Sequence, residues 1–585
     1  MNRWAKCVLL GIVFSVAMVL PAQLVSLAQE PAKEPVRPAP EVIAAWEEAG
    51  AEFGWISILQ LENLPWRSGK EKPPAGAVPA FRVTLLPPGK IKVPPPPGVP
   101  FGLRFEGLRV ADARLKGLAG LKQLQRLELI YTQVTDAGMK ELAGLTQLQS
   151  LNLYLTKPTD AGLKELAGLT QLLSLNLAYT QVTDAGLKEL AGLTRLQSLN
   201  LFGTQVTDAG LKELAGLQQL QVLGLTLQVT DAGLKELAGL NQLQTLDLQY
   251  SKVTDTGLQE LAGLTKLHSL SLFGTQVTGA GLKELGALKQ LQTLNLYGTQ
   301  VSDAGLKELA GLKQLQSLDL RQTKLTDAGL RELTGLTKLQ SLNLLNVQVT
   351  DAGLKELAGL KQLHTLNLSN TTVTDAGLKE LTGLKQLQSL DLRQTKLTDA
   401  GLKELAGLTK LQLLNLFGTQ VTDAGLKELA GLKQLQTLDL ATTQVTGVGL
   451  KELAGLTEFQ TLDLGGHQVT DVGLKELAGL RQLRTLKLVI ARQVTDVGLK
   501  ELAGLKQLRT LNLFGTPVTD AGLKELSGLK QLQTLDLQAP QVTDAGLKEL
   551  AGLKQLQSLG LGNTKVTDAG VQELQRALPL VQISR

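Results

Sequence analysis

The chain has 585 residues, with 59 lysines and arginines against 54 aspartates and glutamates, so its net charge of +5 is small for its length. No basic block and no basic patch interleaved with aromatic residues is present, and the composition therefore gives no support for nucleic-acid binding. The single cysteine, Cys7, falls in a predicted targeting segment. A processed chain would then have no disulfide, no cysteine-ligated metal and no cysteine nucleophile.

Residues 1–28 have the pattern of an export signal. Basic residues at positions 3 and 6 precede an uncharged apolar run over 8–20, and small residues at 26–28 fit a signal peptidase site. Two alternatives stay open, cleavage after Ala28 or retention as an uncleaved membrane anchor. Both place the rest of the chain outside the cytoplasm, in the periplasm, the cell envelope or the extracellular space.

Residues 29–111 differ in composition from everything that follows. Sixteen of the twenty prolines lie before residue 101 and all four tryptophans before residue 67. Residues 29–40 are predicted to form a proline-rich extended linker. Residues 41–111 are predicted to form an N-terminal cap, with a helix over 41–50 and strands over 55–61 and 80–86. Trp46, Trp55 and Trp66 form either an aromatic binding site or a lid over the open end of a repeat array, and we favour the lid.

Residues 112–567 consist of repeats. The unit from Thr183 to Val206, TDAGLKELAGLTRLQSLNLFGTQV, recurs from Asp112 to the C-terminus. The twenty units are all 24 residues long, except one of 23 from Asp208 and one of 25 from Asp471. One unit alone buries too few apolar side chains to offset the entropy of ordering it, so the units are expected to stack.

Each unit is expected to contain one strand and one short helix. Leu199 and Leu201 alternate with polar residues, which is typical of a half-buried strand. The segment after Thr183 has helical periodicity over about two turns. Asp184 is predicted to cap this helix, and Gly192 to end it in the left-handed conformation. Residues 568–585 are predicted to be the last repeat and a C-terminal cap, with a longer helix and a final strand.

The pattern L-x-x-L-x-L-x-x-T-x-V-T-D-A-G-L resembles a leucine-rich repeat, over about four fifths of the chain. It is most similar to the cysteine-containing, ribonuclease-inhibitor-like subclass, and to the long arrays of bacterial exported proteins. The resemblance implies an α/β solenoid, a right-handed horseshoe with a parallel concave sheet and short convex helices. The ladder position holds threonine in most units, as at Thr204, and its hydroxyl is expected to satisfy turn backbone groups between layers.

Strand residues between the leucines are expected to face solvent on the concave side. One column is mostly Asn or Asp, and we interpret it as a solvated polar face rather than as paired carboxylates or a calcium site. The next column contains aromatic residues and arginine, which are enriched at binding hot spots. The alternative is that duplication copied them without selection. The predicted partner-binding residues are Tyr154, Phe202, Phe273, Tyr297, Arg321, Arg393, Phe417 and Phe514.

No catalytic residues, cofactor or metal site are predicted. The histidines, His268, His364 and His467, fall in three different units and cannot converge. We therefore expect a non-catalytic, exported, monomeric scaffold that binds a protein or glycan through its concave face, with no membrane contact beyond the signal. The alternative is a substrate-recognition subunit resembling F-box/leucine-rich-repeat ubiquitin-ligase adaptors, which share the repeat. An enzyme or GTPase activator is a third, less favoured reading.

Overall fold

The computed structural model describes residues 35–57, 66–73, 77–83, 94, 96–105 and 110–585. The predicted export signal over 1–28, with Cys7, lies outside the described residues, as do residues 29–34 of the predicted linker and residues 58–61 and 84–86 of the two predicted strands. Within the described ranges, no helix has the length and apolar character needed to cross a membrane. The chain divides into unit 1, residues 1–224 with 242–245, and unit 2, residues 225–241 with 246–585.

The N-terminal part of unit 1 is a helix packed on a small sheet. Helix α2 (Pro40–Glu48) precedes β1 (Ala51–Ser57), which pairs antiparallel with β2 (Arg67–Ser68) and β3 (Ala77–Val83); β4 (Phe101–Phe105) pairs parallel with β3. Trp46 stacks on Phe81 with ring centroids 4.7 Å apart. Trp46 and Trp55 are each only 4% exposed, so these two tryptophans belong to the core and leave no ring free to hold a ligand.

Each repeat contributes one short strand and one short helix. The repeat strands are β5 (Leu124–Glu128), β6 (Ser150–Asn152), β7 (Ser174–Asn176), β8 (Ser198–Asn200), β9 (Val222–Gly224), β10 (Thr245–Asp247), β11 (Ser269–Ser271), β12 (Thr293–Asn295), β13 (Ser317–Asp319), β14 (Ser341–Asn343), β15 (Thr365–Asn367), β16 (Ser389–Asp391), β17 (Leu413–Asn415), β18 (Thr437–Asp439), β19 (Thr461–Asp463), β20 (Thr485–Lys487), β21 (Thr510–Asn512), β22 (Thr534–Asp536), β23 (Ser558–Gly560) and β24 (Gln582–Ser584).

The α-helices of the repeats begin at the Asp of the T-D-A-G motif. They are α3 (Asp112–Leu115), α4 (Asp136–Leu142), α5 (Asp160–Lys164), α6 (Asp184–Leu187), α7 (Asp208–Leu211), α8 (Asp231–Leu234), α9 (Asp255–Leu258), α10 (Asp303–Leu306), α11 (Asp327–Arg331), α12 (Asp351–Leu357), α13 (Asp375–Leu378), α14 (Asp399–Leu405), α15 (Asp471–Lys475), α16 (Asp496–Glu501), α17 (Asp520–Leu526), α18 (Asp544–Glu549) and α19 (Asp568–Ala577).

Tighter 3₁₀ turns extend or replace these helices in many repeats. They are η1 (Lys116–Gly120), η2 (Lys188–Leu190), η3 (Lys212–Gly216), η4 (Lys235–Leu237), η5 (Gln259–Leu261), η6 (Gly281–Ala287), η7 (Lys307–Gly311), η8 (Lys379–Leu381), η9 (Asp423–Leu429), η10 (Leu450–Leu453), η11 (Glu476–Gly479), η12 (Leu502–Gly504) and η13 (Leu550–Gly552). The expected helix of about two turns is thus one α-helical turn followed by a 3₁₀ turn in repeats such as that of α6.

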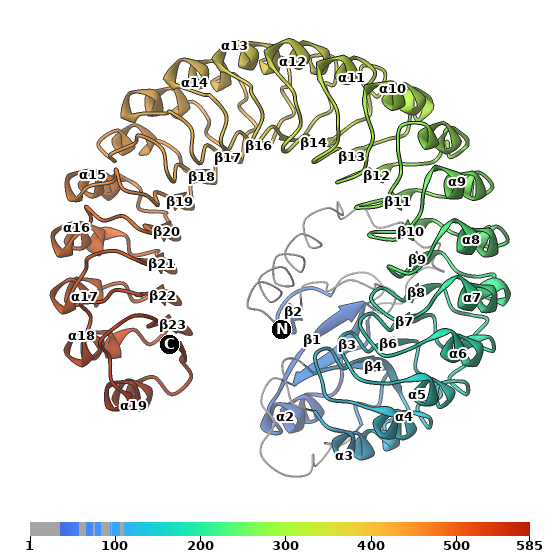
Figure 1. The fold of residues 1–585 in the computed structure, drawn as a ribbon. Helices are drawn as coiled ribbons and strands as arrows, with labels where there is room; N and C mark the ends of the chain where they lie inside the picture. Colours follow the sequence, from blue (N-terminus) through green and yellow to red (C-terminus); the bar gives the residue numbers. More distant parts are fainter. Residues whose placement is uncertain (1–34, 58–65, 74–76, 84–93, 95, 106–109) are drawn as a thin grey trace. The chain divides into compact units, whose positions relative to one another are not determined.

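The repeat strands pair in parallel and in chain order within each unit. In unit 1, Leu151, Leu175 and Leu199 lie directly opposite one another, and they are at most 1% exposed. In unit 2, consecutive strands from β11 to β24 also pair with equivalent repeat positions opposite one another. Figure 1 shows the strands of unit 2 along its inner, concave edge and the helices along its outer edge. The predicted fold class, an α/β leucine-rich solenoid, is confirmed.

The aspartate of the T-D-A-G motif ties its repeat to the next, except in the two repeats where Gly279 and Gly447 replace it. Asp184 Oδ1 accepts the Thr207 N–H at 2.7 Å, and its Oδ2 accepts the Thr207 hydroxyl at 2.7 Å. The helix cap is Thr183, whose hydroxyl oxygen accepts the Ala185 N–H at 3.3 Å. The prediction that Asp184 caps its own helix is therefore wrong: its carboxylate is used between layers. Gly210 permits this contact, because a Cβ there would lie 3.1 Å from the Asp184 Cα.

The left-handed residue of each repeat is not the glycine that was expected. Gly192 is absent from the positive-φ residues, whereas Gly203, just before the ladder threonine, has φ +71°. In several other repeats the helix end is bound by a lysine of the preceding repeat, as Lys122 Nζ donates to the Gly144 carbonyl at 3.1 Å. A cation at the carbonyl end of a helix also interacts favourably with its dipole.

The ladder threonines act within a turn rather than between layers. The Thr204 hydroxyl donates to the carbonyl of Leu201, three residues earlier, at 2.6 Å. Thr371 makes the same bond to Leu368 at 2.6 Å. Val347 occupies this position in one repeat and is 3% exposed, so the site also accepts an apolar residue. The expected bridge between layers is thus replaced by a bond that closes the turn after each strand.

Candidate binding surface

Most members of the Asn and Asp column are half-buried, so the column is less solvated than the polar face that was predicted. Asn152 and Asn176 are 5% and 6% exposed. Their Oδ1 atoms accept the N–H groups two residues further on, from Tyr154 at 3.0 Å and from Ala178 at 2.9 Å. Such Asx bonds fix a turn. This column therefore sets the direction in which the chain leaves each strand, and it offers little to a ligand.

Burial also changes the acidity of two members of this column. It raises the pKa of Asp247 to about 6, although hydrogen bonds from Gln249 and Ser271 oppose the shift. Burial likewise raises the pKa of Asp439, and the nearby charge of Asp463 adds to it. Within the described ranges, no three His, Cys, Asp or Glu side chains converge as metal ligands. Asp247 and Asp439 are therefore interpreted as structural residues of the sheet.

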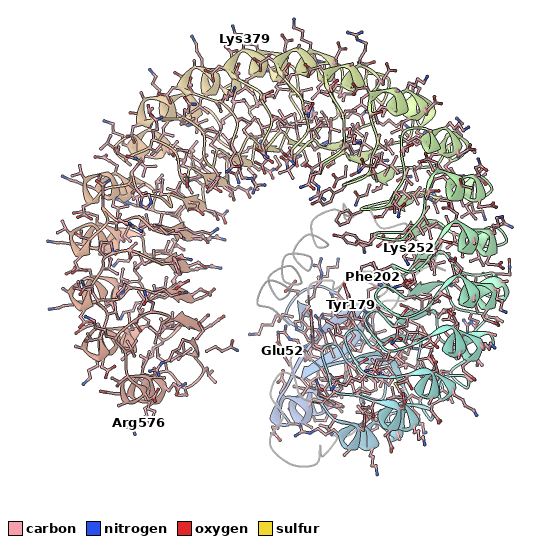
Figure 2. The ribbon with its side chains drawn as sticks, in the orientation of Figure 1. Glu52, Tyr179, Phe202, Lys252, Lys379 and Arg576 are labelled. Carbon is pink, nitrogen blue, oxygen red and sulfur yellow. The ribbon has the colours of Figure 1, made fainter. Side chains whose placement is uncertain are left out.

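Four rings follow one another along the strand ends of unit 1. Tyr131, Tyr154, Tyr179 and Phe202, here called the unit 1 ladder, meet edge to face with ring centroids 5.5, 5.6 and 5.4 Å apart. Tyr131 is 50% exposed. Burial, followed by the proximity of Tyr131, raises the pKa of the Tyr154 phenol above its usual value. Figure 2 shows Tyr179 and Phe202 side by side.

A second series lies on the strand ends of unit 2. Tyr250, Phe273, Tyr297 and Arg321, here called the unit 2 ladder, form a continuous stack. The Phe273 and Tyr297 rings are parallel within 8° at 4.2 Å, and the Arg321 guanidinium lies 4.3 Å from the Tyr297 centroid. Arg321 is paired with Asp319 at 2.6 Å. The ladder is thus an apolar, half-buried surface whose one cation is neutralised.

Three of the tyrosines have an unfavourable backbone conformation. Tyr131, Tyr179 and Tyr250 have φ of +59°, +57° and +58°. Glycine occupies the same left-handed position at Gly203 and Gly274. A bulky residue in this conformation costs roughly 1–2 kcal/mol. Two of these rings rest on the next layer's glycine, since a Cβ on Gly203 would lie 2.7 Å from the Tyr179 ring and one on Gly274 would lie 2.8 Å from the Tyr250 ring.

The structure brings together five of the eight predicted residues. Tyr154 and Phe202 belong to the unit 1 ladder, and Phe273, Tyr297 and Arg321 belong to the unit 2 ladder. The other three, Arg393, Phe417 and Phe514, stand apart from both ladders. Arg393 is paired with Asp391 at 2.7 Å, and Phe514 is 38% exposed.

Sequence reasoning missed Tyr131, Tyr179 and Tyr250. They occupy the column immediately before the ladder threonine, whereas only the preceding column was followed. In a regular strand neighbouring residues point to opposite faces, but here the strand has ended and the chain turns. The sequence did contain a signal for these three residues, because tyrosine stands at a position that is glycine in several other repeats.

The fold and this surface define a repeat solenoid with aromatic ladders on its strand side. A family model described as "Leucine rich repeat" matches residues 355–421. A second model of the same description matches residues 169–191, 193–215, 240–262, 457–478 and 506–527. These segments of the chain are therefore leucine-rich repeats. No curated protein matches the chain significantly.

Several solved structures are similar to the chain. An internalin (inlF) from Listeria monocytogenes is 29% identical, with 52% of this chain and 83% of that chain covered and a TM-score of 0.42. A leucine-rich-repeat protein of Leptospira interrogans is 24% identical, with 82% and 100% covered and a TM-score of 0.44. The ectodomain of the Arabidopsis receptor kinase HAESA, in complex with a peptide hormone, is 20% identical, with 80% and 79% covered and a TM-score of 0.42.

Proposed function

We propose that this chain is a non-catalytic, exported scaffold that binds a protein partner through the strand face of its repeats. The observation that carries the proposal is the set of tyrosines in left-handed positions, Tyr131, Tyr179 and Tyr250. Glycine satisfies the same turn in other repeats without strain. Non-aromatic residues such as Leu155 and Thr442 adopt the same conformation in other repeats, so strain alone does not mark the site. What is particular to these three positions is that the turn presents aromatic rings, which contact the rings of neighbouring layers.

The chemistry of the ladders suits a protein surface. Aromatic rings give large contact areas at low conformational cost, and they are enriched among the residues that carry binding energy. The rings are already held against one another, as Phe273 is against Tyr297. Little side-chain entropy is therefore lost when a partner binds. Arg321 adds a guanidinium whose charge is balanced by Asp319.

Two finer assignments belong to this proposal. The pattern of residues 1–28 supports export, with cleavage or anchoring of that segment both compatible with binding outside the cytoplasm. The threonine that closes each turn, as Thr204 does, supports the cysteine-containing, ribonuclease-inhibitor-like subclass of repeat. A glycan remains the alternative ligand class, since sugar faces also stack on aromatic rings.

A capture experiment tests the proposal. Purified chain is immobilised and incubated with cell-envelope and secreted extracts, beside a variant that carries Tyr250→Gly, Phe273→Ser and Tyr297→Ser. We expect the wild type to retain a protein that the variant loses, while the circular dichroism of the two is the same. Retained material that resists protease and is released by glycosidase would instead identify a glycan.

The matched control changes three lysines on the helix side. Lys355→Gln, Lys379→Gln and Lys403→Gln alter exposed positions of the repeat helices, and Figure 2 shows Lys379 at the outer edge. This control is expected to capture the partner as well as the wild type does. Loss of capture in the control, with the ladder variant unaffected, would place the binding surface on the helices and contradict the proposal.

A further inference from the structure

The layers of β20 and β21 depart from the charge pattern of the array. Arg484 and Arg509 stand immediately before Thr485 and Thr510, where most other layers have glutamine. Lys487 stands in the column that is otherwise Asn or Asp in most layers. A patch that differs from an otherwise copied sequence is not explained by passive duplication. These three residues are here called the basic patch.

The basic patch is accessible and only partly neutralised. Arg484 and Arg509 are exposed, and they are neighbours because the Arg509 N–H donates to the Arg484 carbonyl at 2.8 Å. Neither guanidinium has an ion pair within the described ranges. Lys487 Nζ lies 3.5 Å from Asp463 Oδ2, and its side chain is 46% exposed. Two adjacent guanidinium groups are thus available to an anionic ligand.

Apolar side chains are exposed at the other end of the same layers. Ile490 and Phe514 are 37% and 38% exposed, and the Ile490 N–H donates to the Phe514 carbonyl at 2.7 Å. Ile490 has φ +58°, a conformation that is rare for a β-branched residue. The same short stretch of sheet therefore offers positive charge before the strands and apolar surface after them.

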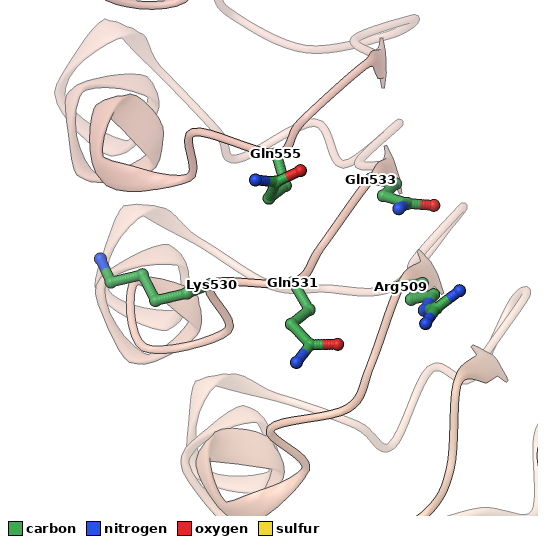
Figure 3. Close-up of a pocket in the computed structure, with 5 residues that line it drawn as sticks. All are labelled: Arg509, Lys530, Gln531, Gln533 and Gln555. Atoms are coloured by element: carbon green, nitrogen blue, oxygen red, sulfur yellow. The ribbon is translucent and has the colours of Figure 1, made fainter. Parts of the chain in front are cut away.

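A hollow beside Arg509 extends the basic end toward the next layers. It has a volume of about 380 Å³ and is lined by Arg509, Lys530, Gln531, Gln533 and Gln555 (Figure 3). Figure 3 shows Arg509 and Gln533 at their strands, while Lys530 extends toward a helix. Lys530 Nζ donates to the Gly552 carbonyl at 3.3 Å. Arg509 with the surrounding glutamine amides therefore provides several donors for a carboxylate.

We infer that the face of β20 and β21 binds an extended acidic peptide segment that carries an apolar anchor. Its carboxylates lie on the basic patch, and its apolar side chain lies on Ile490 and Phe514. Phe514 lies five positions after Arg509, which corresponds to roughly 16 Å of extended chain. The peptide should therefore carry its acidic and apolar residues about five positions apart.

The exposed apolar pair favours a peptide over an acidic polysaccharide, which would satisfy the arginines and leave Ile490 and Phe514 uncovered. The inference rests on the proposed function, since both use the strand face as the binding surface. Different residues carry the two proposals, because the unit 2 ladder ends at Arg321 and takes no part in this site.

The test is selection of binders from a displayed library of random dodecapeptides on the full-length chain. The comparison variant carries Arg484→Gln, Lys487→Asn and Arg509→Gln, residues that the array itself uses at these positions, so folding is expected to be retained. Selected peptides should contain two or more acidic residues and an aromatic or aliphatic residue about five positions away. Their affinity should fall roughly tenfold or more in the variant, since exposed ion pairs contribute modestly each.

Added salt should weaken the selected peptides because exposed charges are screened. Lys355→Gln with Lys379→Gln and Lys403→Gln, which removes the same charge, should leave their affinity unchanged. The inference is overturned if the selected peptides lack acidic residues, or if they bind the variant as tightly as they bind the wild type. The inference is also overturned if no acidic peptide is selected and alginate, an acidic polysaccharide, binds through Arg484, Lys487 and Arg509. Peptide binding should persist in the variant that carries Tyr250→Gly, Phe273→Ser and Tyr297→Ser. A failure of the proposed function at the ladders can therefore be distinguished from a failure of this inference.

Discussion

Replacing Gly353 with alanine is expected to lower the free energy of unfolding by about 2–4 kcal/mol, although alanine is the better helix former. A Cβ at this position would lie 3.0 Å from the Asp327 Cγ and 3.1 Å from the Leu330 Cδ1 of the preceding repeat. It would push the Asp327 carboxylate away from Thr350, whose N–H and hydroxyl donate to it at 2.8 and 2.6 Å. Overpacking costs about 1–3 kcal/mol and each lost hydrogen bond about 1 kcal/mol, offset by about 1 kcal/mol of helix propensity.

The control for this change lies six residues further along the same repeat. No atom lies within 4 Å of a Cβ built on Gly359, and its φ is not positive. Gly359→Ala is therefore expected to leave stability unchanged or to raise it by up to about 1 kcal/mol. Urea denaturation followed by circular dichroism compares the two. Equal effects of the two substitutions would show that the Asp–Thr contacts do not hold neighbouring repeats together.

Replacing Tyr131 and Tyr179 together with glycine is expected to weaken partner binding at least a hundredfold while changing stability by no more than about 1 kcal/mol. The rings lost are two of the four in the unit 1 ladder. A hot-spot aromatic residue contributes about 2 kcal/mol or more, and 1.4 kcal/mol corresponds to a factor of about ten. Loss of ring packing is partly offset because glycine adopts these positive φ values without strain.

Isothermal calorimetry with the captured partner gives the affinity, and urea denaturation gives the stability. Thr442→Gly is the matched control, because Thr442 has φ +58° at the equivalent position and carries no ring. This substitution is expected to leave the affinity unchanged. If the double tyrosine variant binds normally, or if it binds weakly only because it has unfolded, the ladder is a structural feature and not a binding surface.

The fold could be predicted because one period governs the whole array. The 24-residue spacing places a leucine such as Leu199 at the same depth in every layer, so strand, core and stacking follow together. The contacts between layers could not be predicted in the same way. A single unit shows Asp184 at a helix start, where capping is the ordinary reading. Its true partner, Thr207, becomes apparent only when the next layer is placed beside it.

The candidate surface was predictable in part for a related reason. Strand alternation groups Tyr154 with Phe202 in unit 1 and Phe273 with Tyr297 in unit 2, and each pair does lie within one ladder. It also implied that the Asn column is solvated, but backbone N–H groups at the strand ends need acceptors, and Asn152 supplies one. The tyrosines at left-handed positions, such as Tyr179, lie where alternation no longer applies, so the ladders emerged only from the turn geometry.

Hydroxyl-radical footprinting of the chain, free and bound to its captured partner, tests most directly whether the strand face is the binding surface. Oxidation of the exposed Tyr131 and of the half-buried rings of the two ladders should fall on binding. Oxidation of Val472 and Leu580, which are 67% and 85% exposed away from the ladders, should stay the same. Unchanged oxidation of the ladder rings, with protection of Val472 in helix α15, would contradict this assignment.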